Sequence, residues 1–285
     1  MAWEREDGCV SRYDLPLPAR GADSPQVLAL AERIAKFLLW SAGGWRLMLA
    51  GPPELCEALK KKYSKTGARK FDATLMESVY GRPMIVERLP LSKMPRARDR
   101  ALKMDNRFDG CRLGFDLGAS DFKISAVENG EVKFSDEFPW DPRNQPDPEY
   151  HYAKLNEGLR KAAAALPRVD AIGGSTAGVV VNNSIKVASL FRAIPAARYP
   201  QAQAMFQRLQ KEWNVPVEVA NDGDVTALAG LLSLGKKGIL GVAMGSSQAA
   251  GFIDRKGRLT GRLSELAFAP VDLHPDAPAD EWSGD

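Results

Sequence analysis

The sequence predicts an α/β protein with two or three compact units. Its 285 residues exceed the size of most single-core domains. Helical and strand-like apolar patterns alternate along the chain, and groups of short strands joined by glycine turns begin near residues 111 and 238. A hydrophobic content of 45% and a charged content of 26% are ordinary for a soluble globular protein. Such a pattern resembles a duplicated α/β fold whose second half begins again late in the chain.

The N-terminal part is predicted to be an irregular arm followed by an α/β segment. Residues 1–23 are polar and contain prolines, which favours an arm without regular structure. Ser24-Pro25 is typical of a helix start, and Gly43-Gly44 should end that helix. The rest of segment 24–110 predicts a strand (WRLMLA), an amphipathic helix (GPPELCEALKKKYSKTG), a strand (RPMIVERLP) and a basic connector that forms the domain boundary.

Residues 111–215 are predicted to form the next unit, and residues 216–285 the start of another. Three strands (CRLGFDLG, FKISAVEN, EVKFSDEF) are joined by turns at Gly118–Asp121 and Asn129-Gly130. A helix begins at Asp147-Pro148, and a strand with a small-residue loop (VDAIGGSTAGVVVNN) and a second helix (PQAQAMFQRLQKEW) follow. The last part predicts a strand (VPVEVA), a helix (NDGDVTALAGLLSLG), a strand (GILGVAM) and a hairpin (GFIDRKGRL).

Charge and cysteine usage exclude several classes of protein. Residues 1–110 carry 20 Lys/Arg and 14 Asp/Glu, a basic balance that is more often a solvated surface than a nucleic-acid site. The three cysteines lack CxxC spacing, so neither zinc nor a disulfide framework is expected, which fits a reducing cytoplasm. No segment resembles a signal peptide or a membrane span. We therefore expect a cytoplasmic protein that contacts neither membrane nor nucleic acid.

The first motif with chemical potential is the turn in DLGASDFK, which follows a strand ending at Asp116. A pinched turn at Gly118, Ala119 and Ser120 can direct backbone N–H groups into one concavity and bind an anion, with help from Lys123. The alternative is an ordinary hairpin with a glycine turn, which the motif alone does not exclude.

The second and third motifs lie downstream. Asn221-Asp222 stands between a strand and a helix, so Asp222 is a candidate general base and Asn221 a candidate ligand for a substrate hydroxyl. The alternative is that Asp222 or Asp224 caps the helix. The third motif places Gly245, Ser246 and Ser247 between two strands, which predicts either a second phosphate turn or another hairpin.

Taken together, the two turns with an acid between them resemble the sugar kinase/Hsp70/actin superfamily. Within it, NDGDVTALAG resembles the NDAN…AL signature of the ROK sugar kinases and repressors, over about residues 111–272. The resemblance implies a ribonuclease H-like (actin-like ATPase) fold of two lobes, with the second lobe incomplete. It also implies ATP-dependent phosphorylation of a sugar hydroxyl, with ATP and Mg²⁺ as cofactors and a sugar and a nucleotide as partners. A homodimer is left open.

The same resemblance implies a role for each site residue. Asp116 would organise Mg²⁺ through water, and Asp222 would take the hydroxyl proton. Phosphates would be held by Gly118, Ala119, Ser120, Lys123, Gly245, Ser246 and Ser247. The sugar would be held by Gly174 and Ser175 in the glycine-rich loop, together with Asn221, Asp222 and Glu265.

Departures from the family pattern keep other functions open. Ser246-Ser247 replaces the usual Thr-Gly, Phe268 stands where the family has histidine, and the zinc-binding cysteine cluster is absent. These changes motivate a non-catalytic, sugar-responsive binding or regulatory protein as the alternative. A DNA-binding repressor is not favoured, because no helix-turn-helix with a wing is predicted.

Only 63 residues follow Asp222, fewer than the family uses to build its adenine pocket. Three explanations stand: the chain is a fragment, segment 24–110 substitutes for the missing part, or that segment is an unrelated accessory unit. The run RLMLAGPPELCEALKKK resembles the strand, turn and helix that close the adenosine side of such a lobe.

Overall fold

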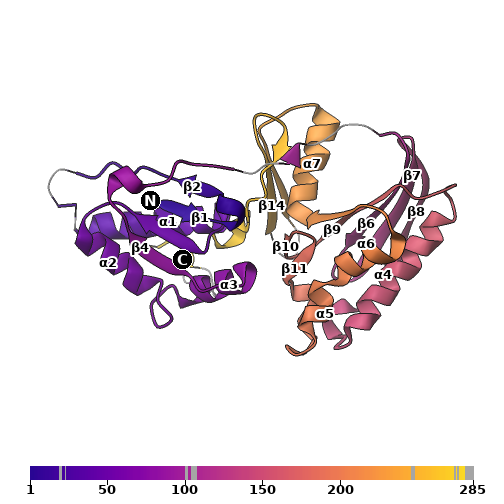
Figure 1. Ribbon diagram of the computed structural model, residues 1–285, viewed down its shortest axis with the longest axis horizontal. Helices are drawn as coiled ribbons and strands as arrows, with labels where there is room; N and C mark the ends of the chain where they lie inside the picture. The colour runs from indigo at the N-terminus through magenta and orange to yellow at the C-terminus, as the bar shows by residue number, and fades with distance from the viewer. Residues whose placement is uncertain are drawn as a thin grey trace. The chain divides into compact units, whose positions relative to one another are not determined.

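The computed structural model describes residues 1–18, 21–22, 24–99, 102–103, 108–244, 248–272, 274 and 276–279. The chain forms two compact units (Figure 1). Unit 1 comprises Met1–Leu102, Met244–Phe252 and Arg258–Asp285, and unit 2 comprises Lys103–Ala243 and Ile253–Gly257. Each unit is described by itself below.

A five-stranded sheet forms the centre of unit 2, in the order β12-β9-β6-β7-β8. Its strands are β6 (Cys111–Leu117), β7 (Asp121–Glu128), β8 (Glu131–Pro139), β9 (Ala171–Thr176) and β12 (Val217–Asn221). Strand β7 runs antiparallel to β6 and β8, while β6, β9 and β12 are mutually parallel. This mixed order is the ribonuclease H-like arrangement. It agrees with the three strands that the sequence predicts and with the helix, strand and helix predicted after them. The predicted fold class is confirmed.

The turn between β7 and β8 shows how local sequence sets this register. Asn129 and Gly130 have φ values of 52° and 87°. Two consecutive positive φ values define the tight hairpin turn that matches the twist of antiparallel strands, and Asn-Gly adopts it readily. The hairpin predicted at Asn129-Gly130 is therefore confirmed.

Helices cover one face of this sheet and complete the core of unit 2. Figure 1 shows α4 (Pro148–Ala163) and α6 (Met205–Trp213) on the same side of the strands. Phe206 of α6 stacks on Phe115 of β6, with ring centroids 5.7 Å apart. The other elements of the unit are β10 (Val179–Val181), β11 (Ser184–Val187), α5 (Tyr199–Gln203), α7 (Asp222–Leu234) and β13 (Ile239–Met244), the last of which ends at the boundary of the unit.

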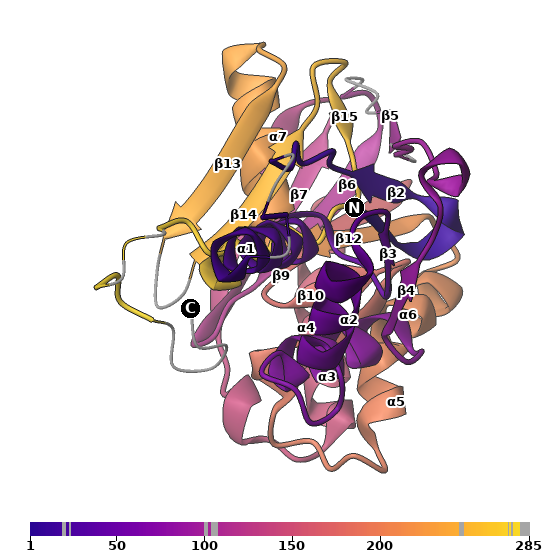
Figure 2. The same ribbon diagram turned by 90° about the vertical axis from the view of Figure 1, so that its left-hand side faces the viewer.

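Unit 1 contains a four-stranded sheet in the order β2-β1-β3-β4. Its strands are β1 (Ala2–Glu4), β2 (Val10–Arg12), β3 (Arg46–Leu49) and β4 (Ile85–Arg88). Figure 2 shows the helices α1 (Pro25–Ala42), α2 (Pro53–Lys62) and α3 (Lys70–Tyr80) of this unit. All three contribute apolar side chains to the same core. Strands β14 (Gln248–Ile253), β15 (Arg258–Leu259) and β5 (Leu102–Lys103) are neighbours in a further sheet.

The first and the last parts of the chain share the core of unit 1. Trp40 of α1 contacts Phe268 with ring centroids 4.5 Å apart. The backbone N–H groups of Leu263 and Ser264 donate to the carbonyls of Ala42 and Ser41, at 3.2 and 3.1 Å. Segment 24–110 therefore does not stand apart, because its first helix is tied to residues near the end of the chain.

Several elements differ from the prediction. The arm expected at residues 1–23 contains β1 and β2, and Trp3 is fully buried. Both strands are only three residues long; β2 pairs with β1, and the pairing of β1 with β3 is a tertiary effect. The predicted helix after Pro200 is two helices that meet at Ala204, and α3 was not predicted. The predicted division at residue 216 is not where the compact units divide.

Among the described residues, none of the helices combines the length and apolar character needed to cross a membrane.

Candidate functional site

The candidate residues of unit 2 gather where the parallel strands end. Asp116 on β6 lies opposite Ser175 on β9, and Thr176 lies opposite Asn221 at the end of β12. Because parallel strands deliver their carboxyl ends to the same edge of a sheet, ligands of open α/β sheets bind there. The structure thus places Asp116, Ser175, Asn221 and Asp222 at the same edge of the sheet.

Asp116 is held by its neighbour on β9. The Ser175 hydroxyl donates a hydrogen bond to Oδ1 of Asp116, and Ser175 is almost fully buried. The preceding residue must be glycine, because a Cβ at Gly174 would lie 2.1 Å from the ring of Phe115. Gly174 thus has a packing role, which allows Ser175 to approach the carboxylate.

Asn221 joins the end of β12 to α7 and to the glycine-rich loop. Its Oδ1 accepts a hydrogen bond from the N–H of Gly223 at 2.7 Å, so Asn221 is the N-cap of α7. Its Nδ2 donates to the carbonyl of Gly178 at 2.8 Å. The capping role considered for the acids of this motif therefore falls to Asn221, and its amide is engaged at both ends.

Asp222 is the first residue of α7 and is partly buried. Burial raises its pKa, and the negative charge of Asp116 adds to that effect. The N–H of Gly223 donates to Oδ1 at 3.1 Å and opposes the shift. A helix N-terminus alone would lower the pKa of Asp222. Desolvation outweighs it here, which makes the carboxylate a stronger base.

The turn after β6 is a closed hairpin. The N–H of Gly118 donates to the carbonyl of Asp121 at 3.0 Å. Trp140 donates its indole N–H to the Gly118 carbonyl at 2.9 Å and its backbone N–H to the Ser120 carbonyl at 3.2 Å. A Cβ at Gly118 would lie 2.8 Å from the Asp121 carbonyl, so the turn requires glycine there. The hairpin interpretation is confirmed.

The same turn still offers backbone donors. No described residue accepts a hydrogen bond from the N–H groups of Ala119 or Ser120. The carbonyls beside them are occupied by Trp140, which fixes the direction of the peptide planes. Two adjacent N–H groups of this kind are the donors that an anion-binding turn uses. The hairpin and the anion-site interpretations are therefore compatible.

Asp121 is a residue of the candidate site that the sequence analysis does not predict. Its carboxylate accepts hydrogen bonds from the Ser120 hydroxyl at 2.8 Å and from Nζ of Lys123 at 3.2 Å. The hydrogen bond from Ser120 contributes most to lowering the pKa of Asp121, and the hydrogen bond from Lys123 lowers it further. The sequence signal for this contact is the second aspartate of the motif DLGASDFK. Both side chains predicted to help hold phosphate are thus engaged by a carboxylate.

The remaining predicted residues are placed elsewhere or not described. Gly245, Ser246 and Ser247 lie outside the described residues. Glu265 belongs to unit 1, where it directly precedes the short 3-10 helix Leu266–Phe268. No group of three or more His, Cys, Asp or Glu side chains within the described ranges is arranged to hold a metal ion.

Comparisons with known proteins gave matches among solved structures. No protein-family model and no curated protein matches the chain. A ROK hexokinase from Thermus thermophilus is 22% identical over 60% of this chain and 56% of its own, with a TM-score of 0.48. A ROK family transcriptional regulator, a homologue of the E. coli MLC protein, is 22% identical over 60% of this chain and 43% of its own, with a TM-score of 0.48.

An inorganic polyphosphate/ATP-glucomannokinase from Arthrobacter sp. strain KM is 20% identical over 58% of this chain and 66% of its own, with a TM-score of 0.45. The chain thus spans between 43% and 66% of the lengths of these solved structures. ROK proteins, the family that NDGDVTALAG resembles, are among its structural neighbours. These likenesses are too low to transfer an activity.

Proposed function

We propose that this protein transfers a phosphoryl group from ATP to a sugar hydroxyl, with Asp222 as the general base. The observation that carries the proposal is the raised pKa of Asp222, which lies beside Asp116 where β6, β9 and β12 end. A partly buried carboxylate next to a second carboxylate is the arrangement by which proteins tune an acid for proton transfer. The NDGDVTALAG motif supports the same assignment.

In this proposal, each residue of the candidate site has a separate role. Asp222 accepts the proton of the sugar hydroxyl as that oxygen attacks the phosphorus, and it fixes the direction of attack. Because the transition state of phosphoryl transfer is loose, orientation matters more than basicity. Ser175 holds the carboxylate of Asp116 in place, and the N–H groups of Ala119 and Ser120 would bind phosphate oxygens.

The donor set of this site suits Mg²⁺ better than zinc. Mg²⁺ is usually bound through one or two carboxylates, waters and substrate phosphates, and the site offers the carboxylates of Asp116 and Asp222 without histidine or cysteine. Asp116 is the residue that would hold the ion, through water. When bound, the ion would neutralise negative charge on the transferring phosphoryl group.

A second candidate is a sugar-responsive binding protein without catalysis. One observation favours it: the carboxylate of Asp121 engages the side chains of Ser120 and Lys123 in the phosphate turn. A carboxylate inside the phosphate turn opposes the binding of another anion. This candidate retains the sugar site and loses the nucleotide site.

The two candidates are separated by measuring ADP release and sugar binding on the same samples. The protein is incubated with ATP, Mg²⁺ and a panel of hexoses and N-acetylhexosamines, and sugar binding is followed by the shift of the thermal unfolding midpoint. ADP release that depends on one sugar supports the kinase. Stabilisation by a sugar without ADP release supports the binding protein, and neither signal contradicts both.

A further inference from the structure

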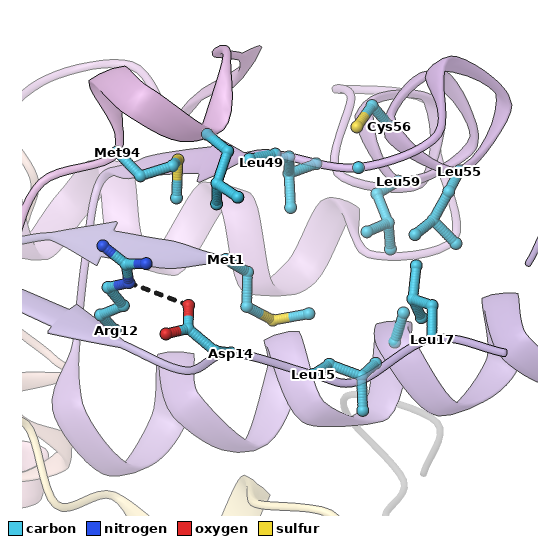
Figure 3. A pocket seen from close by; sticks show the side chains of 14 residues that line it. Met1, Arg12, Asp14, Leu15, Leu17, Leu49, Leu55, Cys56, Leu59 and Met94 are labelled. Carbon is cyan, nitrogen blue, oxygen red and sulfur yellow. Dashed lines mark hydrogen bonds and ion pairs between the residues drawn. The ribbon is translucent and has the colours of Figure 1, made fainter. Parts of the chain in front are cut away.

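A cavity of about 350 Å³ lies within unit 1, away from the motifs discussed above. Figure 3 shows its walls: the strand β3 and the turn that follows it, the helix α2, and the extended segment after β2. Its volume falls at the lower end of the roughly 300–1,000 Å³ that small-molecule sites occupy. All of its lining residues belong to the N-terminal part of the chain.

The walls are mostly aliphatic. Leu49 lies between Met94 and α2, Leu55 and Leu59 project from α2, and Leu17 faces them from the extended segment (Figure 3). The apolar lining is completed by Met1, Leu15, Ala31, Ala50, Leu91 and Met94. Such a surface excludes water and takes up apolar atoms.

The buried side chain of Cys56 forms part of the same wall. Its thiol is a free, buried cysteine on α2 and lines the cavity. Burial raises the pKa of Cys56, so the thiol stays neutral at physiological pH. A charged group placed against this wall would likewise lose hydration, which is unfavourable.

The polar side chains Arg12 and Asp14 meet in the described lining, and the N-terminal ammonium of Met1 donates to the Tyr13 carbonyl at 2.9 Å. Nε of Arg12 donates to Oδ1 of Asp14 at 2.9 Å, and Nη1 donates to the Pro95 carbonyl at 3.2 Å. The Asp14 side chain is 70% exposed, so the pair stands on the solvent side of the cavity. The pair is neutral as a whole, and it offers both acceptor and donor atoms.

We propose that this cavity is a binding site for an uncharged small molecule with an aliphatic body and one hydroxyl or amide head group. The body fills the space between β3, α2 and Leu17, and the head group exchanges hydrogen bonds with the Arg12–Asp14 pair. A charged head group is disfavoured, because it loses hydration against the aliphatic walls, whereas Arg12, Asp14 and the Met1 ammonium already have hydrogen-bond partners.

The test compares three probes that share an eight-carbon chain: 1-octanol, octanoate and octylammonium. Isothermal calorimetry and the thermal unfolding midpoint are measured for the whole chain. We expect saturable binding of one 1-octanol, and at least about tenfold weaker binding of both charged probes. Absence of saturable 1-octanol binding, or tighter binding of either ion, would overturn the proposal.

Two variants locate the binding. Ala50→Phe places a ring into the cavity and should abolish 1-octanol binding, whereas Ala68→Phe adds the same ring at an exposed position away from the lining. Equal binding by both variants would contradict the proposed location. If Ala50→Phe does not fold, wild-type protein gives the answer: 1-octanol should slow the modification of Cys56 by N-ethylmaleimide, mapped by peptide mass spectrometry. Unchanged modification under saturating 1-octanol would likewise count against it.

Discussion

The hydroxyl of Ser175 donates a hydrogen bond to the carboxylate of Asp116 across the ladder between β9 and β6. Both residues stand near the carboxyl ends of their strands, next to Asp222 at the start of α7. This one bond ties the glycine-rich loop to the first strand of unit 2. The geometry of the candidate site therefore depends on a buried serine as well as on its acids.

Ser175→Ala should destabilise the fold, because it removes a buried donor from an ionisable group. Hydrogen bonds to charged groups contribute about 1.5–3 kcal/mol, so a loss of this order is expected in the free energy of unfolding. Urea denaturation followed by circular dichroism measures it. Ser135→Ala, at an exposed position of β8, is the matched control and should change stability by less than about 0.5 kcal/mol. Equal effects would show that the bond contributes nothing.

Asp222→Asn should stabilise the protein at neutral pH. The pKa of Asp222 is raised in the folded state, chiefly by burial, so between its ordinary and its folded pKa the folded chain binds more protons than the unfolded chain. The free energy of unfolding then falls as pH rises through that window, and the cost is fully present above the folded pKa. The Asp222→Asn variant does not have this cost, because asparagine does not ionise. Its unfolding midpoint should exceed that of wild type at pH 7, and the difference should shrink toward pH 3.

Gly118→Ala should disrupt the turn after β6. The added Cβ would lie 2.8 Å from the Asp121 carbonyl, which is backbone and cannot move aside cheaply. Crowding of this kind typically costs about 1–3 kcal/mol. Gly173→Ala is the control, since a Cβ there meets nothing within 4 Å. Thermal unfolding should separate the two variants, and similar midpoints would contradict the described turn.

Phe268→Ala should loosen unit 1. The Phe268 ring packs on Trp40 and on Phe71, with centroids 4.5 and 5.7 Å apart. Because the ring is only partly buried, we expect a loss of about 1–3 kcal/mol, below the range for a fully buried phenylalanine. Val271→Ala, at a residue that is 85% exposed, controls for truncation near the end of the chain. If both variants unfold at the same midpoint, the last residues do not support the N-terminal core.

The sequence predicts the elements that carry their own local signals. Ser24 accepts a hydrogen bond from the N–H of Val27, and Asn129-Gly130 forms the tight turn. Helix α3 was missed because no side chain caps its start at Arg69. Strand β1 pairs with the nearby β2, but it also pairs with β3, which lies more than forty residues away. Local patterns cannot report a partner so distant in the sequence.

The sequence predicts which residues form the candidate site, but it does not predict the shifts in their pKa values. The motifs place Asp116, Ser175 and Asp222 correctly at the strand ends. The raised pKa of Asp222 depends on how tertiary packing buries it, which no spacing reveals. The engagement of Ser120 and Lys123 by Asp121 depends on how the turn folds, which the order of residues in DLGASDFK does not specify.

The central claim is tested most directly by sugar-dependent ADP release from wild type, Asp222→Asn and the matched control Asp224→Asn. Loss of a general base typically lowers turnover by about 10²–10⁴-fold. We predict a loss of that size for Asp222→Asn, with sugar-induced stabilisation retained, and turnover near that of wild type for Asp224→Asn. Unchanged turnover in a folded Asp222→Asn protein would contradict the account.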